Sequence, residues 1–215
     1  MLIKSYQLLE QCDPAILPRL LPLFSRTAAE VCEGQQYDMD FEGRLDVSVA
    51  EYIEMIRLKT AVLLAGALKI GAICGGAGEM DAQFLYEFGI GIGIAFQLKD
   101  DLLDVYGDIK DFGKEIGGDI CCNKKTFLLI SAMQKAEGED KEELMKWITA
   151  KEFDREEKVA AVTNIYDKLH LRSLTEMKMR EYYDQAIEAL RKVERSEAEK
   201  EKLYQLAERL IHRIS

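Results

Sequence analysis

Proline and histidine are scarce in this chain of 215 residues, which contains three prolines and two histidines, His170 and His212. Few prolines leave long helices unbroken, and the fifteen glycines form no repeat. The five cysteines are an odd number without C-x-x-C spacing, so with only two histidines they make no zinc set. Unpaired thiols are typical of a reducing cytosol, and we therefore expect a cytoplasmic protein.

The sequence also lacks an excess of basic residues and a long apolar run. It has 29 Lys and Arg against 39 Asp and Glu, a formal net charge of −10, which argues against nucleic acid as a partner. The longest apolar run, 61–72, contains Lys69 and is too short to cross a bilayer, and we see no signal-peptide pattern. An anionic substrate therefore needs a metal ion or a local lysine cluster to bind here.

Helix-forming residues dominate what is present, and 48% of the chain is hydrophobic. We predict an all-α fold with a single domain over 1–215, because no linker or change in composition divides it. Capping boxes begin three helices, at Ser48, Ser173 and Ser196. Apolar periodicity and caps predict helices over 1–12, 14–32, 48–74, 81–106, 125–137, 139–150, 154–169, 173–193 and 196–213, with a loop over 108–125.

The most informative segment is a group of polar residues on one face of the fourth predicted helix. Asp100 and Asp104 are one turn apart, and Asp101 and Gln97 share their face. Carboxylates at this spacing repel each other, whereas Mg²⁺ prefers one or two carboxylates together with phosphate oxygens. A solvated acidic face is the plain alternative. The apolar residues before the group and the lysines after it favour a site for Mg²⁺ and a phosphate.

Lysines occur where such a site can use them. Lys114 lies in the loop after the acidic helix, and Lys124 and Lys125 end that loop. Lys59 lies on an otherwise apolar helix face. Its ammonium group either extends to solvent or meets an anion, and the residues alone leave both interpretations open.

Four motifs, in this order, resemble the trans-type isoprenyl diphosphate synthases, the family of farnesyl, geranylgeranyl and longer polyprenyl diphosphate synthases. They lie at Glu33–Asp40, Tyr52–Ala61, Phe96–Asp104 and Gly113–Thr126. The resemblance implies a helical bundle of the isoprenoid synthase type around a deep central cavity. It also implies a homodimer whose partners are allylic and homoallylic diphosphates, which it condenses by Mg²⁺-assisted ionisation.

The resemblance assigns roles to individual residues. Three carboxylates are implied as ligands of Mg²⁺: Asp100, Asp101 and Asp104. Four residues are implied to be catalytic: Lys59, Gln97, Asp100 and Asp38. Five residues are implied to bind the substrate diphosphate: Lys59, Thr60, Gln97, Lys114 and Lys124. Gly34 and Gln35 are implied to orient the residues that face the reacting carbons.

The family's first D-D-x-x-D motif and the paired arginines after it are missing from this sequence. We therefore expect the chain to be the C-terminal two-thirds of a longer synthase, truncated at its N-terminus, and to be inactive or nearly so by itself. Two alternatives stay open: a non-catalytic subunit that tunes an active partner, and a helical scaffold without a ligand. The acidic motif and the loop lysines favour the enzyme, because neither alternative needs them.

Overall fold

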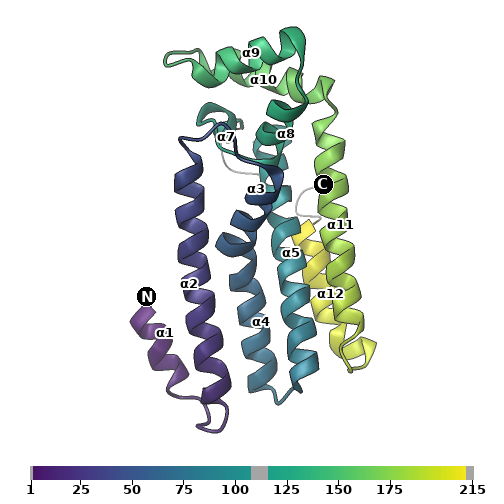
Figure 1. Ribbon diagram of the computed structural model, residues 1–215. Helices are drawn as coiled ribbons and strands as arrows, with labels where there is room; N and C mark the ends of the chain where they lie inside the picture. The colour runs from purple at the N-terminus through teal and green to yellow at the C-terminus, as the bar shows by residue number, and fades with distance from the viewer. Residues whose placement is uncertain (1, 108–115, 212–215) are drawn as a thin grey trace.

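A computed structural model describes residues 2–107 and 116–211 (Figure 1). This part of the chain is helical and contains no strand, which confirms the predicted all-α class. The helices are α1 (Leu2–Leu9), α2 (Leu17–Phe41), α3 (Val49–Ile56), the π-helix η1 (Arg57–Ala61), α4 (Val62–Cys74), α5 (Glu79–Tyr106), α7 (Gly118–Cys121), α8 (Phe127–Lys135), α9 (Gly138–Thr149), α10 (Arg155–Lys168), α11 (Leu171–Arg191) and α12 (Glu197–Ile211).

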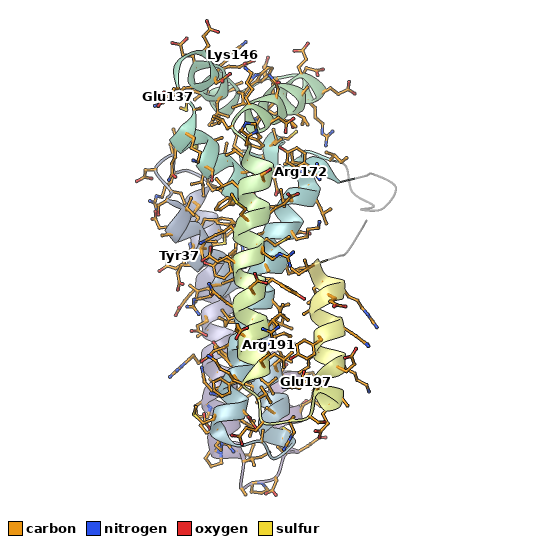
Figure 2. The ribbon with its side chains drawn as sticks, turned by 90° about the vertical axis from the view of Figure 1, so that its right-hand side faces the viewer. Tyr37, Glu137, Lys146, Arg172, Arg191 and Glu197 are labelled. Carbon is orange, nitrogen blue, oxygen red and sulfur yellow. The ribbon has the colours of Figure 1, made fainter. Side chains whose placement is uncertain are left out.

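Four long helices, α2, α4, α5 and α11, run side by side and form the body of the molecule (Figure 1). α5 packs along both α4 and α11, while α9 and α10 lie across the end of the bundle at which α2 ends. In Figure 2, Arg172 and Arg191 mark the two ends of α11, and Glu197 marks the start of α12 beside it. No helix within the described ranges is both long enough and apolar enough to cross a membrane.

Glycines in α5 allow its two neighbours to approach closely. A Cβ atom on Gly89 or Gly93 would lie 2.5 Å from the Cα atom of Ala65 or Ala61 on the α4 side. A Cβ atom on Gly91 would lie 2.7 Å from the backbone oxygen of Tyr182 in α11. The alternating glycines therefore serve packing on both faces of one helix, and their cost in helix propensity is offset by these contacts.

Two of the three predicted caps are present. The hydroxyl of Ser48 accepts the backbone N–H of Glu51 at 3.2 Å, and Ser196 makes the same contact with Glu199 at 3.4 Å. The prediction for Ser173 was wrong, because α11 already begins at Leu171. The preceding residue has a left-handed backbone conformation, which turns the chain sharply and leaves Ser173 within the first turn.

α2 is longer than its sequence predicts. The predicted end near residue 32 was wrong, and the helix continues to Phe41 through the Gly-Gln-Gln motif. Gly34 is buried there, and a Cβ atom on it would lie 2.3 Å from the backbone nitrogen of Lys59. Tertiary packing against η1 therefore outweighs the low helix propensity of this glycine.

The predicted helix over 48–74 is continuous along the chain but not uniform. Residues Arg57–Ala61 form one π-helical turn between α3 and α4. Such π-bulges are rare and occur frequently at functional sites. This turn carries Lys59 and Thr60.

Candidate diphosphate and metal site

Lys59 on η1 pairs with Asp38 on α2. The Lys59 Nζ atom lies 2.6 Å from Oδ2 of Asp38, and 33% of the Lys59 side chain and 22% of the Asp38 side chain are exposed. The close approach at Gly34 brings the two helices together one turn before Asp38. The anion that Lys59 contacts in the structure is thus the carboxylate of Asp38. Because its side chain is partly exposed, the ammonium group can also contact a second anion.

A chain of hydrogen bonds links η1 to α5. The hydroxyl of Thr60 donates to Oε1 of Gln97 at 3.1 Å, and Nε2 of Gln97 donates to Oδ1 of Asp101 at 3.2 Å. The other oxygen of Asp101 accepts the hydroxyl of Tyr52 from α3. These contacts fix the orientation of the Gln97 amide, because its oxygen and nitrogen each have a defined partner.

Asp101 is buried, with 2% of its surface exposed. Burial raises the pKa of Asp101 to about 7, although the Tyr52 hydrogen bond and the charge of Lys124 act in the opposite direction. The Tyr52 pKa is also raised, by burial and by the nearby carboxylates. Both oxygens of Asp101 are engaged with protein groups, so of the three carboxylates predicted to bind metal this one is turned inward.

Asp104 is held by the start of α7. The backbone N–H of Asp119 donates to Oδ2 of Asp104 at 2.9 Å, and the N–H of Gly117 donates to the Asp104 backbone oxygen at 2.6 Å. Burial, together with the charge of Asp119, raises the pKa of Asp104. The predicted loop over 108–125 thus contains a short helix whose backbone folds back onto α5.

Lys124 faces the same carboxylates. Its Nζ atom lies 3.3 Å from Oδ1 of Asp119. Burial acts to lower the Lys124 pKa, but Asp119, Asp101 and Asp38 together outweigh it, and the pKa is raised. Asp119 therefore connects the loop lysine to Asp104. The predicted Lys114 lies outside the described residues.

The remaining predicted residues take simpler positions. Asp100 is half-buried on α5, one turn before Asp104, and Gln35 is exposed on α2 beside the buried Gly34. The structure thus brings residues from α2, η1, α5 and the segment after α7 to one end of the bundle. The sequence interpretation missed two members of this group, Tyr52 and Asp119. Tyr52 precedes Lys59 by two helical turns and Asp119 precedes Lys124 by five residues, but neither spacing identifies a site without the fold.

Two of the carboxylates on α5 suit a divalent cation that also binds another ligand. In the described part of the chain, no group of three or more His, Cys, Asp or Glu side chains is arranged to hold a metal ion. Asp100 and Asp104 offer two carboxylates on one face of α5. Mg²⁺ is commonly held by one or two carboxylates together with substrate phosphate oxygens. The donor set therefore suits a cation whose coordination is completed by a phosphate ligand.

Comparison with known proteins shows the family. Residues 1–166 match the polyprenyl synthetase family, and the chain belongs to it. It is 35% identical over 201 residues to the short chain isoprenyl diphosphate synthase of Methanothermobacter thermautotrophicus, covering 94% of this chain and 61% of that protein. The chain thus spans about three-fifths of the length of this curated relative.

Solved structures of similar sequence share the fold. A crystal structure of a geranylgeranyl pyrophosphate synthase matches with a TM-score of 0.92 and 39% identity, over 100% of this chain and 66% of that one. The geranylgeranyl pyrophosphate synthase of Corynebacterium glutamicum, solved with isoprenyl diphosphate and magnesium, matches with a TM-score of 0.88 and 26% identity, over 99% of this chain and 61% of that one. The predicted isoprenoid synthase type of helical bundle is therefore confirmed.

Proposed function

We propose that this chain is part of a prenyltransferase that condenses an allylic diphosphate with isopentenyl diphosphate. The observation that carries the proposal is the meeting of Lys59, Lys124 and the acidic end of α5 at one end of the bundle. Ammonium groups beside carboxylates that suit a divalent cation form a site for a highly charged phosphate ester. The named activities of the relatives support the same reaction class.

The reaction begins with cleavage of the bond between the allylic carbon and the diphosphate oxygen. The bonding electron pair leaves with the diphosphate, which leaves an allylic carbocation. The double bond of isopentenyl diphosphate attacks this cation to form a carbon–carbon bond, and loss of a proton forms the new double bond. Products are a longer prenyl diphosphate, inorganic diphosphate and a proton.

The residues of this chain stabilise the charge that develops on the leaving diphosphate. We propose that Lys59, Lys124, Thr60 and Gln97 bind its oxygens, and that Lys114 joins them. Groups aimed at developing charge in a partly buried site stabilise the transition state more than the ground state, and they thereby lower the barrier. Asp38 sets the position of Lys59, while Gly34 and Gln35 support this wall of the site.

Mg²⁺ is the proposed metal. When bound, it would neutralise negative charge on the diphosphate. We propose Asp100 and Asp104 as its ligands, because their carboxylates lie on one face of α5. Asp101 was also predicted as a ligand, and its two hydrogen bonds support a different part for it, which is to hold Gln97 and the helix face in place. The magnesium bound to the Corynebacterium relative supports the choice of metal.

We propose further that the 215-residue chain alone binds diphosphate but turns over slowly or not at all. The missing D-D-x-x-D motif and the coverage of 61% of a curated relative support this. An assay with allylic and isopentenyl diphosphates plus Mg²⁺ tests it, and fast turnover would disprove the predicted inactivity. The missing motif also fits a non-catalytic subunit, which the same assay distinguishes when an active partner is added.

Ligand-dependent stability tests the site itself. We expect inorganic diphosphate with Mg²⁺ to raise the melting temperature, because a ligand at 100 times its Kd stabilises the native state by about 2.7 kcal/mol. Asp100→Asn should lose this stabilisation. Glu87→Gln, the same chemical change at an exposed position of α5, should keep it. No shift for the wild-type chain at millimolar ligand would favour the scaffold instead.

We also propose that the chain forms a homodimer in the cytoplasm, as its resemblance and cysteine content predict. Two large apolar side chains exposed on one face of α2 support the dimer, since a second copy can cover them: Leu21 and Met39, with 46% and 56% of their surfaces exposed. Light scattering on the purified chain measures the mass directly, and a monomer at all concentrations would contradict the proposal.

A further inference from the structure

Lys158 on α10 is a buried lysine that the proposed reaction does not use. Its relative exposure is 0%. Its Nζ atom donates to Oδ1 of Asn123 at 2.8 Å and to the backbone oxygen of Cys121 at 3.3 Å, and it lies 4.1 Å from the ring centre of Phe153. Within the described residues these partners are uncharged, and burial lowers the Lys158 pKa. A buried ammonium group without a carboxylate is costly, so its hydrogen bonds must serve a defined local structure.

That local structure is the turn over 121–125 between α7 and α8. Asn123 lies within this turn and has a φ angle of 52°, in the left-handed region. Its Nδ2 atom donates to the backbone oxygen of Ile148 at 3.0 Å. The Asn123 side chain therefore joins Lys158 on α10 to the end of α9.

Lys125 also contacts this turn. It is 5% exposed, and its Nζ atom donates to the backbone oxygen of Asn123 at 3.0 Å and to that of Glu42, just after α2, at 3.3 Å. Asn123 thus accepts hydrogen bonds from two buried ammonium groups, one at its side chain and one at its backbone oxygen. Lys124 lies between Asn123 and Lys125, and its own Nζ atom points to Asp119.

We propose that Lys158 is a positioning residue for Lys124. By holding Asn123 and Cys121, it fixes the backbone on the N-terminal side of Lys124, so that this side chain faces Asp119 and the carboxylates of α5. The inference rests on the proposed function, because it is there that Lys124 binds diphosphate. Placement matters at such a site, since a displacement of about 1 Å can cost about 100-fold in rate.

The test compares two buried lysines. Lys158→Met removes the ammonium group and keeps the length of the side chain. The control is Lys200→Met on α12: Lys200 is 4% exposed and also contacts backbone oxygens, those of Arg191 and Val193, at 3.4 Å, and in addition it pairs with Glu197 at 2.7 Å. α12 lies beside the lower half of α11, away from α7 (Figure 1). Both changes remove a buried ammonium group, but only one of them touches the turn.

Two measurements are made on each variant of the full 215-residue chain. Hydrogen exchange of the peptide 119–126 reports how firmly the turn is held. Calorimetric titration with inorganic diphosphate and Mg²⁺ reports the site. We expect Lys158→Met to accelerate exchange in this peptide and to weaken diphosphate binding about tenfold, as loss of a supporting outer contact does at metal sites. Lys200→Met should do neither.

A Lys124→Met background separates positioning from general damage. If Lys158 acts through Lys124, Lys158→Met adds little further loss of diphosphate affinity once Lys124 is gone. An equal loss in both backgrounds, or unchanged exchange and affinity in Lys158→Met, would overturn the proposal. Should Lys158→Met fail to fold, Asn123→Gly replaces it, because this change keeps the left-handed backbone and removes the contact with Lys158. Faster exchange of 119–126 and weaker diphosphate binding are expected of it too, and if both are unchanged the proposal is overturned.

The exchange measurement also keeps the two proposals apart. A wild-type chain that binds no diphosphate contradicts the proposed function. The exchange of 119–126 in Lys158→Met against Lys200→Met still decides whether Lys158 holds the turn.

Discussion

Gly34 on α2 and Lys59 on η1 touch through their backbones: a Cβ atom on Gly34 would lie 2.3 Å from the nitrogen of Lys59. This contact sets the distance between the helix that carries Asp38 and the π-turn that carries Lys59. Any side chain at position 34 must push these two elements apart. The position of Lys59, which is proposed to bind diphosphate, thus depends on Gly34, a residue without a side chain.

Gly34→Ala should destabilise the fold and weaken the site together. Overpacking a close contact costs about 1–3 kcal/mol, and the displaced η1 should also lower diphosphate affinity. Urea unfolding and calorimetric titration measure the two effects. Gly43→Ala is the control, because a Cβ atom there meets no atom within 4 Å. A Gly34→Ala variant as stable as Gly43→Ala would show that the two helices can separate without cost.

Lys59→Met should weaken the binding of diphosphate with little loss of stability. A partly exposed ion pair contributes only about 0–1 kcal/mol to folding, so the main loss is the contact with the anion. Lys178→Met is the control: Lys178 on α11 has a similar exposed fraction, 29% against 33%, and pairs with Glu181 at 2.8 Å. Equal affinities in the two variants would exclude Lys59 from the site.

Tyr52→Phe should be strongly destabilising for so small a change. It leaves one oxygen of the buried Asp101 without its partner, which costs about 1–3 kcal/mol. Thermal unfolding measures the loss. The control, Tyr106→Phe, breaks a 2.8 Å hydrogen bond to Asp167 that is exposed, and its effect should be smaller. Equal losses would mean that the buried pair adds nothing beyond an exposed one.

The contribution of Asp101 to stability should fall as the pH rises from about 4 to about 7 in metal-free buffer. The folded-state pKa of Asp101 is about 7, above its ordinary value of 3.8, so in this window the native state holds a proton that the unfolded state has released. The free energy of unfolding decreases wherever the native state binds more protons. Asp101→Asn removes this component. Urea unfolding at several pH values should therefore show the free energy of unfolding of the variant rising relative to that of the wild-type chain over this window, and a constant difference would contradict the raised pKa.

Much of the site follows from local patterns in the sequence. The one-turn spacing of Gln97, Asp101 and Asp104 predicts a shared helix face, and the structure places these residues on the site side of α5. Lys59 stands out because it is a charge on an apolar helix face. Its partner Asp38 comes from a separate helix, which a helical period cannot predict.

Other features depend on the tertiary structure. The extension of α2 through Gly34 is decided by packing against η1, which no propensity scale contains. The π-turn over Arg57–Ala61 adds no unusual residue to the chain, so it leaves no mark in the sequence. Asp119 joins the site because the start of α7 folds back on Asp104, and Tyr52 joins it by reaching across to Asp101.

The alternating glycines of α5 have a mechanical consequence. With α4 packed on Gly89, η1 on Gly93 and α11 against Gly91, α5 is in close contact with its neighbours on two faces, and this packing opposes its sliding and rotation. The helix that presents Asp100 and Asp104 is therefore a fixed frame. When an anion arrives, the adjustment must come from the flexible side chains of Lys59 and Lys124, which approach this frame.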